Sequence, residues 1–139
     1  MNKFTFNKNE RIVSRKLMDN LFTGNRSHSL AAFPLKAVFA EKESLPGEEP
    51  VQILVSVPKK RFKHAVDRNR VKRQVREAYR LQKHLLIEQL AAGQAVVIAF
   101  IWLSDNHFPS SEIHSRVKSL LLRIRKSVSA VDKQSETSD

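Results

Sequence analysis

Apolar side chains recur every three to four residues in three stretches of the chain, a spacing typical of amphipathic helices. The longest stretch, residues 66–90, brings five apolar positions to one helical face: Val71, Val75, Ala78, Leu85 and Leu86. Residues 110–128 repeat the pattern after Pro109. Residues 14–22 repeat it on a smaller scale behind Ser14, a residue type that caps helix N-termini. The spacing therefore predicts three helices.

Three other stretches are rich in β-branched and aromatic residues and predict strands: 33–41, 51–57 and 94–102. The segment between the first two contains Pro46 and Gly47, a pair typical of turns, so we expect these two strands to form an antiparallel hairpin. The last eleven residues, 129–139, have no apolar pattern and are expected to form a disordered tail.

The predicted order is α-β-β-α-β-α over one domain, residues 1–128. It describes an α/β sandwich of the α+β type, in which helices cover a small mixed sheet. A chain of 139 residues is long enough for one core and too short for two ordinary domains.

Composition bears on the cellular compartment and on membrane association. The longest apolar run, residues 95–103, is far shorter than the ~20 residues of a membrane-spanning helix. The N-terminus lacks the apolar region of a secretory signal, and the chain has no cysteine, so disulfides and thiolate metal sites are excluded. We expect a cytoplasmic protein with no membrane partner.

Positive charge is concentrated in one segment, residues 59–83. It holds eleven basic and two acidic residues, and therefore nine of the eleven net positive charges of the chain. At 100° per residue, one group of side chains lies opposite Val71 on the predicted helix; this group is Asn69, Lys72, Arg73, Arg76, Arg80 and Lys83. Such a face is either a solvated surface or a nucleic-acid contact. The scarcity of acids to offset the repulsion favours the second.

Residues 55–80, VSVPKKRFKHAVDRNRVKRQVREAYR, resemble the protein subunit of bacterial ribonuclease P. The family's signature is a strand, a Lys-Lys pair, a short loop, and a helix that opens with Arg-Asn-Arg and continues with Lys-Arg and Arg-Glu. The matching residues here are Lys59, Lys60, Arg68, Asn69, Arg70, Lys72, Arg73, Arg76 and Glu77. The resemblance covers residues 6–127.

The resemblance implies a ribosomal-protein-like fold with a left-handed β-α-β crossover. It also implies two partners, the catalytic RNA of ribonuclease P and precursor tRNA, with no dedicated protein partner. Cleavage would be carried out by the RNA with Mg²⁺, and the protein would have neither catalytic residues nor a metal site. The RNA-binding residues would be Lys59, Lys60, Arg68, Asn69, Arg70, Lys72, Arg73, Arg76 and Arg80.

The family also holds the 5′ leader of precursor tRNA in a cleft lined by aromatic residues on the first helix and the sheet. In this chain the matching helix positions are Leu17 and Leu21, so apolar contact would replace stacking. Strand alternation adds Lys36 and Ser56 as expected leader-binding residues. Phe39 is a further aromatic candidate, although a core position is the more common place for a lone phenylalanine.

The sequence lacks the clustered histidines and carboxylates that a protein nuclease would need to act without RNA. The histidines are isolated from one another: His28, His64, His84, His107 and His114. Carboxylates are equally scattered, which disfavours a two-metal nuclease. Asp67, at the start of the long helix, is better explained by helix capping than by catalysis. Two alternatives to a ribonuclease P subunit remain at this point: a free-standing RNA- or ribosome-binding module, and a protein nuclease acting alone.

Overall fold

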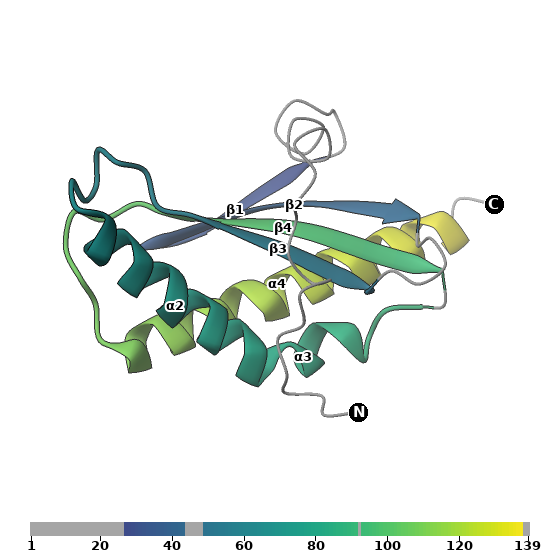
Figure 1. Ribbon diagram of the computed structural model, residues 1–139. Coiled ribbons are helices and arrows are strands. Elements are labelled where there is room, and N and C mark those ends of the chain that lie inside the picture. The colour runs from purple at the N-terminus through teal and green to yellow at the C-terminus, as the bar shows by residue number, and fades with distance from the viewer. Residues whose placement is uncertain (1–26, 44–48, 92, 138–139) are drawn as a thin grey trace.

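The computed structural model describes residues 27–43, 49–91 and 93–137. The elements in chain order are β1 (His28–Ala32), β2 (Leu35–Glu43), β3 (Val51–Ser56), α2 (Ala65–Gln82), α3 (His84–Ile87), β4 (Gln94–Trp102) and α4 (Ser110–Thr137) (Figure 1). The helix predicted over residues 14–22, including Leu17 and Leu21, lies outside the described residues.

The strands form one sheet in the order β1-β2-β4-β3. β4 runs antiparallel to β2 and parallel to β3. The predicted hairpin is therefore wrong: β2 and β3 are not neighbours, because β4 lies between them. β4 is buried on both faces over residues 95–100. A strand that is apolar on both faces buries more apolar surface at the centre of a sheet than at its edge, which explains the position of β4. β3 and β4 are the parallel pair of a β-α-β unit, as the resemblance implies.

β1 was not predicted from the sequence. It pairs antiparallel with β2 across a turn that contains a cis peptide bond between Phe33 and Pro34. Its five residues are exposed or half-buried, so the strand has no strong apolar alternation to reveal it. The predicted strand that began at residue 33 is in fact the second arm of this hairpin.

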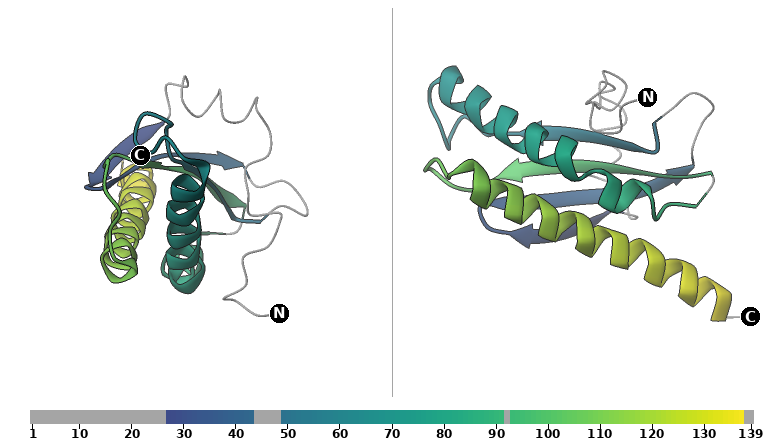
Figure 2. Two further views of the ribbon diagram at one scale, coloured as in Figure 1. Left: turned by 60° about the vertical axis from the view of Figure 1, so that its left-hand side comes forward. Right: turned by 90° about the horizontal axis from the view of Figure 1, so that it is seen from below.

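The helices α2 and α4 lie side by side against one face of the sheet (Figure 2). Their apolar faces and the inner face of the sheet form one core, whose largest members are Trp102, Tyr79, Phe39, Phe100, Leu35, Ile53 and Ile98. The predicted core positions Val71, Val75, Ala78 and Leu86 are all buried, whereas Leu85 is only half-buried.

The long helix predicted over residues 66–90 is interrupted. α2 ends at Gln82, and the chain turns at Lys83 into the short helix α3. Lys83 is consequently buried, with 7% of its surface exposed, and does not belong to the exposed basic face where the helical spacing placed it. At the other end of the domain, α4 continues past Val128 to Thr137, through nine of the residues predicted to be a disordered tail. Extending an existing helix is far easier than starting one, so these residues do not need an apolar pattern to be helical.

Candidate nucleic-acid interface

The basic residues of α2 are held outward by the opposite, buried side of the helix. Val71, Val75 and Tyr79 are fully buried and fix the rotation of α2 about its axis. The predicted RNA-binding positions Asn69, Arg70 and Arg73 are exposed, and Lys72, Arg76 and Arg80 are half-buried. In half-buried Lys and Arg side chains the aliphatic part packs on the protein surface while the charged group stays in water.

The loop before α2, residues 58–64, carries Lys59 and Lys60, and both are exposed. Arg68 fastens this loop to the helix. Its Nη1 donates hydrogen bonds to the carbonyl oxygens of Phe62, at 2.9 Å, and Lys63, at 2.8 Å. The first arginine of the Arg-Asn-Arg motif therefore has an internal role that its neighbours Arg70 and Arg73 do not share.

A second loop, residues 103–109, packs against the first. The His107 ring stacks on Phe62, with centroids 4.5 Å apart and planes at 15°. His107 Nε2 lies 3.0 Å from Asp67 Oδ1, and Arg61 contacts Asp105 at 3.4 Å. Asp67 thus pairs with a histidine forty positions away, whereas the N-cap position of α2 is His64 and makes no side-chain capping bond. The predicted capping by Asp67 is corrected: it lies in the first turn, where its charge still complements the helix dipole.

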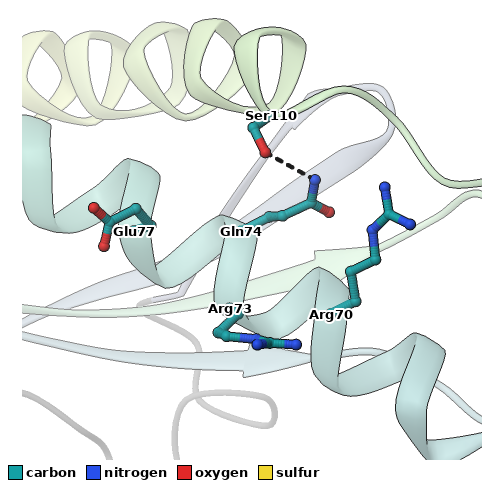
Figure 3. A pocket seen from close by; sticks show the side chains of 5 residues that line it. All are labelled: Arg70, Arg73, Gln74, Glu77 and Ser110. Carbon is teal, nitrogen blue, oxygen red and sulfur yellow. Dashed lines mark hydrogen bonds between the residues drawn. The ribbon is translucent and has the colours of Figure 1, made fainter.

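A shallow depression of about 460 Å³ lies between α2 and the start of α4, and is lined by Arg70, Arg73, Gln74, Glu77 and Ser110. Gln74 bridges the two helices by donating from Nε2 to Ser110 Oγ, at 3.0 Å, and to the carbonyl oxygen of Phe108, at 3.2 Å. Figure 3 shows Gln74 reaching Ser110, with Arg70 and Arg73 beside it and Glu77 pointing away from them. Two cations therefore border a concave surface that the α2–α4 bridge keeps in place.

Glu77 is paired with Arg80. Arg80 Nε donates to Glu77 Oε2 at 3.0 Å, and Nη2 donates to Oε1. The hydrogen bond from Arg80 lowers the pKa of Glu77 below its ordinary value, and the same bond raises the pKa of Arg80. Because the carboxyl pKa is lowered, the pair is fully present at neutral pH and is lost only as pH falls through that lowered value. Glu77 therefore neutralises part of the charge at the C-terminal end of the basic face.

The predicted leader-binding residues Lys36 and Ser56 lie on the same face of the sheet. Both are in register with Ile101 of β4, Lys36 from β2 and Ser56 from β3. This face is the one opposite α2 and α4, because the alternate positions Leu35, Ala37, Val55 and Val57 belong to the helix-side core, and the two residues stand about 10 Å apart across β4. Its centre is apolar, with Val38, Val97 and Ala99 in contact with Leu54 and Ile101. Phe39 points to the other side and is 1% exposed, so it belongs to the core.

Sequence reasoning missed Gln74, Ser110 and His107, whose contacts join segments more than thirty residues apart. The spacing along one helix contains no sign of such contacts. Among the residues that the structure describes, no group of three or more His, Cys, Asp or Glu side chains could hold a metal ion. No helix in that part of the chain is long and apolar enough to cross a membrane.

The fold and the basic face of α2 together define a small α+β protein of the RNA-binding class. The model of the Ribonuclease P family matches residues 6–130, and the chain belongs to that family. The "Ribonuclease P protein component" of Porphyromonas gingivalis is 39% identical over 125 residues, which cover 87% of each chain.

Solved structures agree on the fold. The RNase P protein from Thermotoga maritima superposes with a TM-score of 0.63 at 21% identity, covering 82% of this chain and 96% of that one. A Staphylococcus aureus RNase P protein, described as a mutant with defective mRNA degradation activity, also gives 0.63 at 21% identity, covering 84% and 88%.

Proposed function

We propose that this chain binds the catalytic RNA of ribonuclease P through the exposed side of α2 and the loop before it, and so assists that RNA in removing the 5′ leader from precursor tRNA in the cytoplasm. The main support for the proposal is the local excess of positive charge on the exposed side of α2, whose opposite side is fixed in the core. Arg70 and Arg73 are exposed and, within the described part of the chain, make no hydrogen bond or ion pair. Their guanidinium groups can grip phosphate oxygens without first giving up an internal partner.

The contribution of the protein would be electrostatic and geometric. Two RNAs that approach one another repel, and cations fixed between them reduce that repulsion in a way that added salt or Mg²⁺ partly imitates. Lys59 and Lys60 extend the cationic surface beyond the end of α2, because Arg68 and the His107–Phe62 stack hold their loop. The leader would lie on the other face of the sheet, between Lys36 and Ser56, where the half-buried apolar side chains of Leu54 and Ile101 suit contact with unstacked bases.

Mg²⁺ would belong to the RNA. In-line phosphodiester hydrolysis requires metal ions beside the attacking and leaving oxygens, held by converging ligands. The described residues bring no such ligands together. The protein residues would bind, orient and screen, and would not take part in proton or phosphoryl transfer.

The test is a three-arm assay on precursor tRNA. The arms are the purified protein alone, the partner RNA alone at high Mg²⁺, and both together at low Mg²⁺. We expect no cleavage, slow cleavage and efficient cleavage, with a 5′ phosphate on the mature product. Cleavage at the leader junction by RNA-free protein would contradict the proposal and favour a protein nuclease. If the protein failed to lower the Mg²⁺ requirement of the RNA, a free-standing RNA-binding module would be the better description.

A further inference from the structure

α4 carries a second concentration of positive charge. Within residues 110–128 it has five cations and one acid: Arg116, Lys118, Arg123, Arg125, Lys126 and Glu112. Arg116 and Arg123 are seven positions apart, which places them on the same side of the helix, and both are exposed. Lys118 and Arg125 lie about 180° away on the opposite side.

Both arginines of the first pair are held by the edge strand β1 and the turn that follows it. Arg116 Nε donates to the carbonyl oxygen of Phe33 at 3.0 Å, and Arg123 Nη1 donates to that of Ala31 at 2.7 Å. Both side chains therefore reach the same edge of the sheet, Arg123 at the end of β1 and Arg116 at the turn that follows it. Each guanidinium has five N–H donors, so most of its donors remain after one bond to a carbonyl.

No ion pair neutralises this pair within the part of the chain that the structure describes. Among the described residues, no carboxylate lies within ion-pairing distance of Arg116 or Arg123. Backbone carbonyls fix the direction of the side chains without neutralising them. The arrangement is thus two oriented cations with no ion-pair partner among the described residues, which suits contact with a phosphate backbone.

An exposed aromatic residue stands at the end of this pair. Phe33, whose carbonyl holds Arg116, is 59% exposed. The edge of one ring meets the face of the other where Phe33 contacts Phe108, with centroids 6.0 Å apart. Contact with Phe108 restricts the Phe33 ring while much of its surface stays open. Fixed aromatic rings beside cations are the components with which proteins bind unpaired nucleotides.

This surface is distinct from the basic face of α2. β1 and β3 are the two opposite edges of the sheet. α4 packs under β1 and β2, whereas α2 packs under β3, and Figure 2 shows the two helices side by side with the two edges beyond them. The pair Arg116 and Arg123 points toward the β1 edge.

We propose that Arg116, Arg123 and Phe33 form a second RNA contact surface, which binds the phosphate backbone and an unpaired base of a segment other than the one bound by α2. The proposal rests on the proposed function, because it assumes an RNA complex around this chain. The RNA can be either the catalytic RNA or the precursor tRNA, since both present the same chemistry. A purely structural role, in which the arginines only cover the carbonyls of an edge strand, is the alternative.

The first test compares two double variants with equal loss of charge. Arg116→Gln with Arg123→Gln removes the proposed phosphate grip, while glutamine can still donate to a carbonyl. Lys118→Gln with Arg125→Gln is the control on the opposite side of α4. Binding to each RNA is measured over a range of salt concentrations, together with the thermal midpoint. We expect the first variant to reduce the slope of log K against log salt by about 1.4 to 1.8 for one of the two RNAs, and the control to leave it nearly unchanged.

The outcomes separate this proposal from the proposed function. A third variant, Arg70→Gln with Arg73→Gln, tests α2 alone. If it weakens binding while the Arg116/Arg123 variant binds both RNAs normally, the proposed function stands and the second surface is refuted. A lower thermal midpoint with unchanged slopes would equally refute it, in favour of edge covering. Phe33→Ala should weaken binding by about 5- to 150-fold without changing the slope, because stacking on one base contributes ~1–3 kcal/mol and releases no counterion.

The second test locates the RNA. The chain has no cysteine, so a single one can be introduced as an attachment point. Ser119 lies three and four positions from Arg116 and Arg123, on their side of α4, and Leu81 is an exposed position on α2. A tethered hydroxyl-radical source at Ser119→Cys should cut a different RNA segment from one at Leu81→Cys, and the RNA that is cut identifies the ligand. Absence of cuts above an untethered control at Ser119→Cys would overturn the proposal.

Discussion

Arg68 and Arg73 both lose one positive charge on mutation to glutamine, but the structure predicts different consequences. Arg68 donates to two loop carbonyls, of Phe62 and Lys63, whereas Arg73 is exposed and has no internal partner among the described residues. We therefore expect Arg68→Gln to reduce both stability and RNA affinity, and Arg73→Gln to reduce affinity alone.

The magnitude follows from the two hydrogen bonds of Arg68. A hydrogen bond with a charged donor contributes about 1.5 to 3 kcal/mol when it is desolvated. The bond to Phe62 is part-buried and the bond to Lys63 is exposed, so the second adds less. A loss of about 2 kcal/mol in the free energy of unfolding is the resulting expectation. For a chain of this size, it lowers the thermal midpoint by roughly 8 °C.

The assay is thermal unfolding followed by circular dichroism, run beside RNA-binding titrations at several salt concentrations. Neutralising Arg68, Arg70 and Arg73 together should reduce the salt slope, by about 0.7 to 0.9 for each phosphate that the variant no longer binds. Because Arg68 is engaged with the loop, the reduction should correspond to nearer two phosphates than three. Equal thermal midpoints for Arg68→Gln and Arg73→Gln would refute the reasoning, since the loop would then hold without its arginine.

Three further outcomes are expected. Glu77→Gln removes a carboxylate that pairs with Arg80 and raises the net positive charge of α2, so it should raise affinity for the catalytic RNA and steepen its salt dependence, measured by titration; weaker binding would show that the pair positions Arg80. Truncation after Val128 should leave the thermal midpoint and RNA affinity unchanged, and a drop in either would mean that the tail docks. Lys36→Ala or Ser56→Tyr should weaken binding of precursor tRNA and spare mature tRNA, which lacks the leader; equal losses would relocate the leader site.

The buried half of α2 could be predicted from the sequence because it depends only on local periodicity. Val71, Val75 and Ala78 recur at helical spacing, and all three are buried. The end of the helix was misjudged for the same reason. Periodicity continues through Leu86, but the chain turns at Lys83, and a change of axis leaves no mark in a pattern that resumes on the other side.

The pairing of the strands could not be predicted from local signals. The turn residues Pro46 and Gly47 are compatible with a hairpin, yet they do not determine which strand becomes the neighbour. That choice is made by β4, which is apolar on both sides and gains most from the centre. β1 was not predicted because it is an edge strand with mostly exposed side chains, and such a strand needs few apolar residues. The α4 residues that hold this edge, Arg116 and Arg123, are more than eighty positions away.

The crowding of cations on α2 raises the question of why the helix is stable before RNA binds. Five pairs of basic residues stand three or four positions apart within α2: Arg68/Lys72, Arg70/Arg73, Lys72/Arg76, Arg73/Arg76 and Arg76/Arg80. At about 0.2 to 0.5 kcal/mol for each like-charge pair, the repulsion amounts to roughly 1 to 2.5 kcal/mol.

The buried side of the helix outweighs this repulsion. Val71, Val75 and Tyr79 are fully buried, and a large apolar side chain contributes about 1.5 to 3 kcal/mol on burial, an upper estimate when the unfolded chain is compact. Three such residues exceed the repulsion even at the lower figure. An isolated peptide with this sequence would have the repulsion without the core, so we expect it to be largely unfolded. The rest of the domain is therefore what allows α2 to present its cations in a fixed arrangement, and phosphates that bind there relieve a repulsion that the core had to overcome.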